Sequence, residues 1–163
     1  MTANLIQNIL KRHYKIDGND KLISLNRISK KLLLLQRNEL LSKKQNWLRK
    51  RFGRLIFTNF FINYFKIKDL EKRTEELFRE EINLIKSYLP KQVENIMDIG
   101  CGLGIINIFL NKIYNNRPNF FLLDKNKIDK EIRYGFSSDY ESYNDLNETS
   151  NLLINNYISP RSV

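Results

Sequence analysis

The sequence predicts an α/β fold in which a basic, α-helical N-terminal region precedes a small parallel sheet. Residues 21–52 contain neither Pro nor Gly, residues 69–89 repeat apolar side chains at helical spacing, and residues 93–124 read strand, glycine-rich turn, helix, strand. The chain has 163 residues, 42% of them hydrophobic, so one ordinary core can be buried. We divide it into a basic helical region, residues 1–68, and an α/β region, residues 69–163.

The stretch 21–52 is rich in Leu, Lys, Arg and Gln, which are good helix formers. Its cations recur every seven residues, and on a straight helix they fall between the apolar stripes instead of opposite them. Either the helix breaks near residues 36–38, or the cations lie at the margin of a packed face with buried stems, which we favour. A membrane-surface helix is disfavoured, because its polar and apolar faces must separate.

The net charge of +10 is concentrated in residues 1–54, which hold 14 Lys or Arg and three acids. Such a region suggests a polyanionic partner, either nucleic acid or an anionic membrane surface. The alternative is compositional, since Asn and Ile supply 41 of the residues, a codon bias that also raises Lys. We interpret Trp47 as a packing residue and not as a platform for bases. The candidate nucleic-acid contacts are Lys43, Lys44, Arg49, Lys50, Arg51 and Arg54.

Several classes of protein are excluded by composition. One Cys and one His cannot form a structural zinc site, and a single thiol cannot form a disulfide framework. No run of about 20 apolar residues exists to span a bilayer. The N-terminus also lacks the order of charges of a signal peptide. We therefore expect no metal, no transmembrane segment and a cytoplasmic location.

Residues 69–89 predict an amphipathic helix with Asp69 as its N-cap. Pro90 ends it. Its expected buried positions are Phe78, Ile82, Ile85 and Leu89.

Residues 93–99 predict a strand, 105–114 a helix packed on a sheet, and 119–124 a second strand. The second strand is apolar throughout, so we expect it to be parallel to the first and buried on both faces. Residues 139–156 predict a last helix. Four aromatic residues follow the second strand and either pack or wall a ligand site: Tyr134, Phe136, Tyr140 and Tyr143.

The chemistry lies in the segment Asp98-Ile-Gly-Cys-Gly-Leu-Gly, where a strand ends in a glycine-rich turn that opens a helix. Gly100 permits the tight turn, Gly102 lets a ligand approach the backbone, and Gly104 permits close packing of helix and strand. A ligand there lies on amides near a helix N-terminus. Asp124 ends the next strand 20 residues later, placed to accept hydrogen bonds from ribose hydroxyls.

This segment resembles the first motif of the class I S-adenosylmethionine-dependent methyltransferases, which carry an acid two places before a GxGxG turn. Dinucleotide-binding dehydrogenases use GxGxxG, and Ile105 stands where their third small residue is needed. The resemblance implies a Rossmann-like domain in which Asp98 holds the methionine amine and Asp124 the ribose. The full cofactor-binding set that it implies is Asp98, Gly100, Cys101, Gly102, Leu103, Gly104, Asp124 and Lys125.

The resemblance implies methyl transfer from S-adenosylmethionine to an unknown acceptor, with no catalytic residue carried over. The alternatives are a non-catalytic protein that binds S-adenosylmethionine or RNA through the basic region, and a dinucleotide-dependent oxidoreductase. The family's sheet has seven strands and this chain offers two, so we expect a partial domain, truncated after the second strand and its following helix. Two strands leave open edges. Three origins fit such a chain: a truncated gene product, a partial sequence, or a protomer that completes its sheet with another chain. We therefore expect the chain alone not to be a working methyltransferase.

Overall fold

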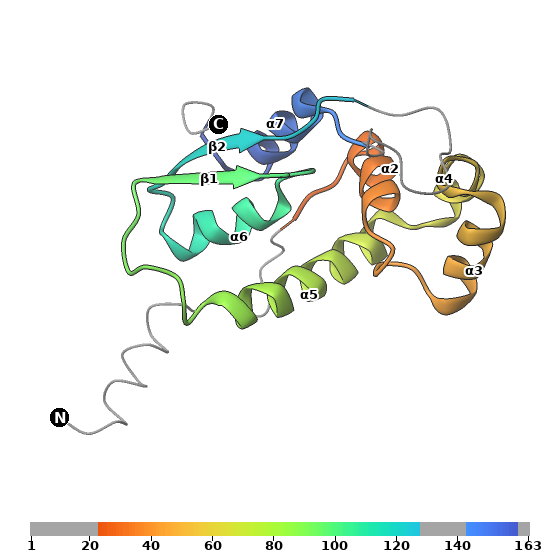
Figure 1. The fold of residues 1–163 in the computed structure, drawn as a ribbon, viewed down its shortest axis with the longest axis horizontal. Helices are drawn as coiled ribbons and strands as arrows, with labels where there is room; N and C mark the ends of the chain where they lie inside the picture. Colours follow the sequence, from red (N-terminus) through yellow and green to blue (C-terminus); the bar gives the residue numbers. More distant parts are fainter. Residues whose placement is uncertain (1–22, 128–142, 160–163) are drawn as a thin grey trace, which may run out of the picture.

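The computed structural model describes residues 23–127 and 143–159, which form a two-stranded sheet packed on helices (Figure 1). Strands β1 (Asn95–Ile99) and β2 (Asn119–Leu123) are parallel, with Asn95 opposite Asn119 and Ile99 opposite Leu123. Their crossover is helix α6 (Ile105–Ile113). The predicted strand–helix–strand unit is therefore confirmed, although β1 begins two residues later than expected.

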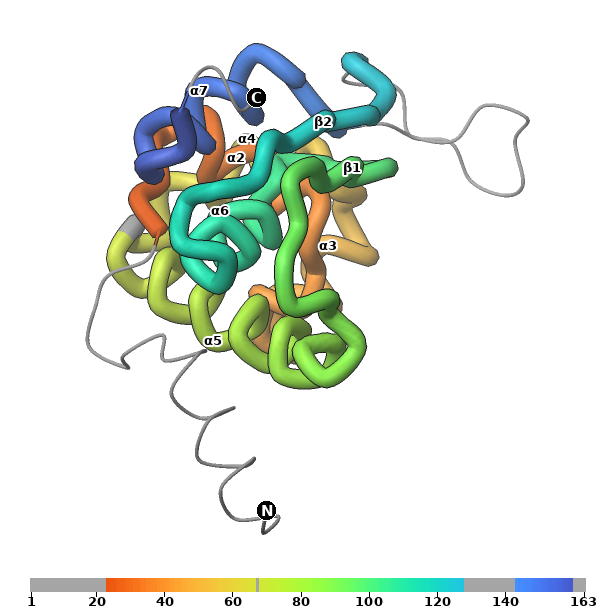
Figure 2. The backbone as a smooth tube through the Cα atoms, turned by 90° about the vertical axis from the view of Figure 1, so that its left-hand side faces the viewer, coloured from red at the N-terminus to blue at the C-terminus, as the bar shows by residue number. Residues whose placement is uncertain are grey.

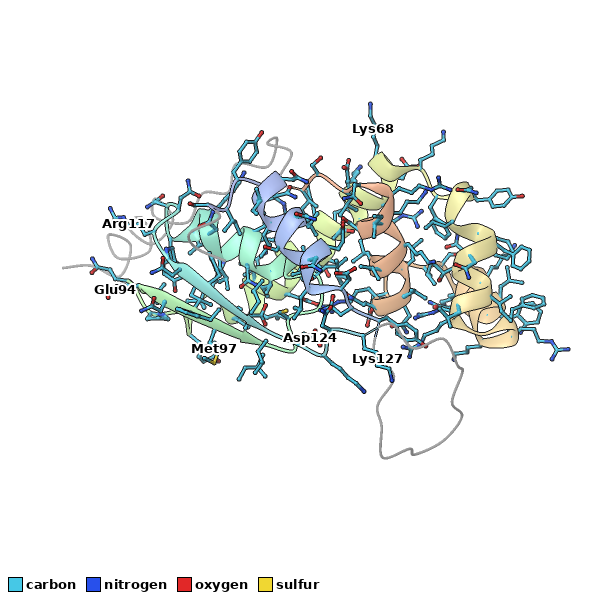
Figure 3. The ribbon with its side chains drawn as sticks, turned by 90° about the horizontal axis from the view of Figure 1, so that it is seen from above. Lys68, Glu94, Met97, Arg117, Asp124 and Lys127 are labelled. Atoms are coloured by element: carbon cyan, nitrogen blue, oxygen red, sulfur yellow. The ribbon has the colours of Figure 1, made fainter. Side chains whose placement is uncertain are left out.

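Among the described residues, helices cover only one face of the sheet. Phe120 is 2% exposed and points toward the helices, whereas its neighbour Phe121 is 54% exposed. Met97 and Ile99 share the outer face with Phe121 and Leu123, and Figure 3 shows Met97 directed away from the helices. The expectation that the second strand is buried on both faces was wrong. The reason is that α6 lies under the strands, while no described element lies over their other face (Figure 2).

Helix α5 (Ile67–Ile85) confirms an amphipathic helix, but it ends before Pro90 and Ile85 is 38% exposed, so the expected end and the burial of Ile85 were wrong. It begins two residues before the expected start, so Lys66 is the N-cap and Asp69 lies in the first turn. A carboxylate there still interacts favourably with the helix dipole. Phe78 and Ile82 are buried, and the Phe78 ring stacks on Phe109 of α6 with centroids 6.1 Å apart.

The N-terminal stretch is broken into short helices, so the favoured continuous helix was wrong. Helix α2 ends at Gln36, and Ser42 starts α3 with a reciprocal capping box that involves Gln45. Two cations nevertheless bury their stems: Lys30, whose Nζ donates to the carbonyl of Phe65, and Arg49. The elements of this region are α2 (Arg27–Gln36), α3 (Lys43–Phe52), α4 (Arg54–Phe61) and the 3-10 helix η1 (Ile62–Tyr64).

Helix α2 is the centre of the packing, because its residues Leu32, Leu33, Leu34 and Leu35 are all at most 1% exposed. It contacts α4, α5 and α7 (Leu146–Asn155). The last helix begins later than predicted, because Asp145 caps it by accepting from the amides of Asn147 and Glu148. Residues 139–142 lie outside the described residues.

Residues 23–25, just before α2, are fixed by side chains from α5 and from the end of α7. The amide of Leu25 donates to Glu71 at 2.9 Å, and that of Ser24 donates to Asn156 at 2.7 Å. One buried apolar cluster consequently runs through the helical region and the α/β region. Among the described helices, none has the length and apolar character needed to cross a bilayer.

Candidate functional site

A cavity of about 470 Å3 lies at the carboxyl ends of the two strands. One wall is the turn after β1 together with Asp124 at the end of β2 (Figure 3). The opposite wall comes from the helical region, through Gln36 at the end of α2 and Arg54 at the start of α4. Ligands of open parallel sheets bind at this end of the strands.

The glycine turn adopts backbone conformations that are unfavourable for residues with a side chain. Gly100 and Gly102 have φ of +75° and +53°, in the left-handed region. The amide of Gly100 donates to Leu123 at 2.7 Å and so extends the pairing of the strands into the turn. A Cβ at Gly102 would lie 2.9 Å from Oε1 of Gln36, whereas one at Gly100 would meet open space.

Asp124 joins the end of β2 to this turn. Its Oδ2 accepts from the amide of Gly102 at 2.6 Å, and its Oδ1 accepts from the amide of Lys125 at 2.6 Å. A carboxylate oxygen can accept two hydrogen bonds, so each oxygen retains capacity for a ligand hydroxyl. The carboxylate is thus held in place while it faces the cavity.

Asp98 is oriented by a residue that the sequence interpretation missed. Its Oδ2 accepts from Nδ2 of Asn107 at 2.7 Å, and Asn107 is completely buried. The other oxygen of Asp98 accepts no hydrogen bond from the described residues, which leaves it for a cationic ligand group. The available signal was that Asn107 is the one polar residue between Ile105 and Leu110.

Three further side chains tie the walls together, and local sequence patterns gave no sign of them. Gln36 Nε2 donates to the carbonyl of Tyr143 at 2.7 Å and to Oδ1 of Asn144 at 3.4 Å. Thr149 Oγ1 donates to the carbonyl of Gly102 at 2.8 Å. Nδ2 of Asn144 is buried and finds no acceptor among the described residues, so a ligand acceptor would satisfy it.

The charges that line the cavity are mixed, with an excess of one acid. Its lining contains three acids, Asp98, Asp124 and Glu39, and two cations, Arg37 and Arg54. Arg37 is already paired with Glu81 at 3.0 Å, and its guanidinium lies 4.9 Å from the centre of the Phe78 ring. The lining therefore favours a ligand with net positive charge.

Cys101 lines the cavity but is poorly suited to act as a nucleophile. Burial, then the nearby carboxylates of Asp98 and Asp124, raise the pKa of its thiol to about 12. The thiolate is the reactive form of cysteine, so a thiol that stays protonated at neutral pH is inert.

Most of the predicted site residues meet at this cavity. Gly104 and Lys125 are outside its lining: Gly104 precedes α6 and packs near Thr149, and Lys125 follows Asp124. Tyr143 lines it, with the Arg54 guanidinium 5.6 Å from its ring centre, while Tyr134, Phe136 and Tyr140 lie outside the described residues. The predicted residues in the lining are Asp98, Gly100, Cys101, Gly102, Leu103 and Asp124.

The six candidate nucleic-acid contacts separate into two groups. Arg49 is 7% exposed and donates to the carbonyl of Leu35 at 2.7 Å, so it serves packing. The other five are exposed. Trp47 is 64% exposed, so its interpretation as a packing residue was wrong.

Comparison with family models, with curated proteins and with solved structures finds no match to this chain. Within residues 23–127 and 143–159, no three His, Cys, Asp or Glu side chains gather where they could hold a metal ion.

Proposed function

We propose that this chain binds S-adenosylmethionine at the glycine-turn cavity and serves methyl transfer of the class I type. The observation that carries the proposal is the contact of Asp124 with the amide of Gly102. It places the acid after the second strand against the turn after the first. The cavity volume of about 470 Å3 also suits a small molecule.

The cavity offers partners for three polar parts of this ligand. The free oxygen of Asp98 would accept from the ammonium group, and Asp124 would accept from the ribose hydroxyls. The buried Nδ2 of Asn144 would donate to a ligand oxygen. When bound, the cofactor supplies an electrophilic methyl group on a sulfonium, and the acidic excess of the lining complements its net positive charge.

The role that we assign to the described residues is to position the reactants. Methyl transfer depends on alignment of acceptor, methyl and sulfur, so a rigid cavity supplies much of the rate. Asn107 and Gln36 support that rigidity, because they orient Asp98 and clamp the loop at Tyr143.

A dinucleotide is the less favourable ligand. Its pyrophosphate carries negative charge, and Asp98 stands at the end of β1, beside the turn where that group binds. Ile105 also occupies the position of the third small residue.

Titration calorimetry of the full chain with S-adenosylmethionine, S-adenosylhomocysteine and NAD tests the proposal. We expect binding of both S-adenosyl compounds and none of NAD. Asp124→Asn removes the charge and replaces one acceptor oxygen with an amide donor, and the loss of a polar partner should cost about 1–3 kcal/mol, or about fivefold to 150-fold in affinity. Equal binding of NAD, or no binding of either S-adenosyl compound, would contradict it.

A further inference from the structure

Helix α3 is held so that one face must point outward. The capping box of Ser42 and Gln45 fixes its start, and Arg49 on its inner side donates to the carbonyl of Leu35 in α2. In Figure 1 this helix lies at the opposite end of the molecule from the sheet. These two contacts fix which side of α3 faces inward and therefore which side faces solvent.

Trp47 lies at the centre of that outer face. Residues three and four positions away are its neighbours on a helix, and all four are cations: Lys43, Lys44, Lys50 and Arg51. All four are exposed, as is the indole. No acid occurs between residues 43 and 54.

Trp47 and its four neighbouring cations have the chemistry of a site for a polyanion that also carries aromatic rings. None of these four cations forms an ion pair within the described part of the chain, and like charges on one helix face repel each other. Beside the indole an open apolar hollow is lined by Lys43, Lys44, Trp47 and Leu48. Single-stranded nucleic acid combines phosphates that neutralise such cations with bases that stack on such rings.

We propose that the outer face of α3 binds single-stranded nucleic acid, with a base stacked on Trp47 and phosphates held by Lys43, Lys44, Lys50 and Arg51. The proposal does not depend on the cofactor. Gly53 joins α3 to Arg54, which lines the cavity, so the two proposed sites are close in the sequence.

An anionic membrane is the competing partner, since α4 exposes Ile56 and Phe60. On α3, however, the cations surround the aromatic ring instead of flanking an apolar face. A helix that lies in a membrane surface needs its apolar and charged faces separated.

Fluorescence anisotropy with a labelled single-stranded RNA dodecamer measures the binding. Trp47→Leu should weaken it about fivefold to 150-fold, the range expected for loss of one stacked base. Lys43→Gln with Lys44→Gln should lower the slope of log affinity against log salt by about 1.4, since each phosphate contact contributes about 0.7. Lys86→Gln with Lys91→Gln removes the same charge from exposed positions at the far end of α5 and should leave the slope unchanged.

Trp47 is the one tryptophan of the chain, so its fluorescence reports stacking directly. Unlabelled RNA should quench it in the wild type. The proposal is overturned if RNA does not bind at low salt, if both lysine pairs change the slope equally, or if Trp47→Leu binds like the wild type. Binding to phosphatidylserine vesicles with no RNA binding would assign the face to membranes instead. Because these readouts need no cofactor, they can fail while S-adenosyl compounds still bind.

Discussion

The two walls of the cavity are built in different ways. The strand wall comes from one continuous stretch, β1 to Asp124, in which the glycine turn and the acid are joined by a 2.6 Å hydrogen bond. The helical wall is assembled from Gln36, Arg54 and the loop at Tyr143, which are far apart in the sequence. A short motif therefore specifies half of the site, and tertiary packing specifies the other half.

The largest expected effect comes from removing one buried side chain from the core behind each wall. Leu34→Ala in α2 and Ile108→Ala in α6 remove side chains that are at most 1% exposed. Each should lower the free energy of unfolding by about 2–5 kcal/mol. If the walls form one cooperative unit, urea denaturation will show a single transition that shifts in both variants. Two transitions, of which Leu34→Ala shifts only one, would show that the walls unfold independently.

Substitution of Gly102, where the two walls touch, should have the next largest effect on stability. Gly100→Ala and Gly102→Ala both place a side chain at positive φ, which costs about 1–2 kcal/mol. Only the Cβ at position 102 also meets Gln36, at 2.9 Å. Gly102→Ala should therefore destabilise the chain more, and Gln36→Ala should reduce the difference between the two variants. A difference that persists in the Gln36→Ala background would show that the walls do not touch there.

Cys101 reports whether the helical wall covers the glycine turn. Because its thiol pKa is raised to about 12, the thiolate fraction at pH 8 is smaller than in the unfolded chain, where the thiol has its ordinary pKa. Iodoacetamide should alkylate the folded protein at least about tenfold more slowly than the protein in denaturant. The rate should keep rising above pH 9 instead of levelling off there. Equal rates in both states would mean that the turn is open.

The ion pair between Arg37 and Glu81 should have the smallest effect. Both side chains are about one-third exposed, at 36% and 32%, so solvent screens their attraction. Glu81→Gln should cost at most about 1 kcal/mol, and the cost should shrink in high salt. Thermal unfolding at two salt concentrations measures it, and a larger cost that salt does not change would indicate a packing role for Glu81.

The strand wall could be predicted from the sequence because its signals are local. The apolar run of α6, the glycines before it and Asp124 act within 30 residues of each other. The second strand was misjudged on one point: its apolar run suggested burial on both faces, but burial depends on whether another layer exists. Phe121 is left exposed because none of the described elements covers it.

The helical wall could not be predicted in the same way. Gln36 contacts Tyr143 across 107 positions, and no spacing rule reveals such a partner. Local patterns also failed to predict which side of α3 faces inward: Arg49 is buried and Trp47 is exposed, the reverse of what was expected. The sequence predicted packing for Trp47 and nucleic-acid contact for Arg49, but tertiary packing turned Arg49 inward and Trp47 outward.

We propose that both walls bind one cofactor, and this predicts the affinity of S-adenosylhomocysteine for three proteins. Calorimetry should give measurable binding to the wild type and an affinity about fivefold to 150-fold lower for both Asp124→Ala and Gln36→Ala, since each loses a polar partner at the site. No binding to the wild type would contradict the account. Wild-type affinity in Gln36→Ala, with the loss confined to Asp124→Ala, would contradict the part assigned to the helical wall.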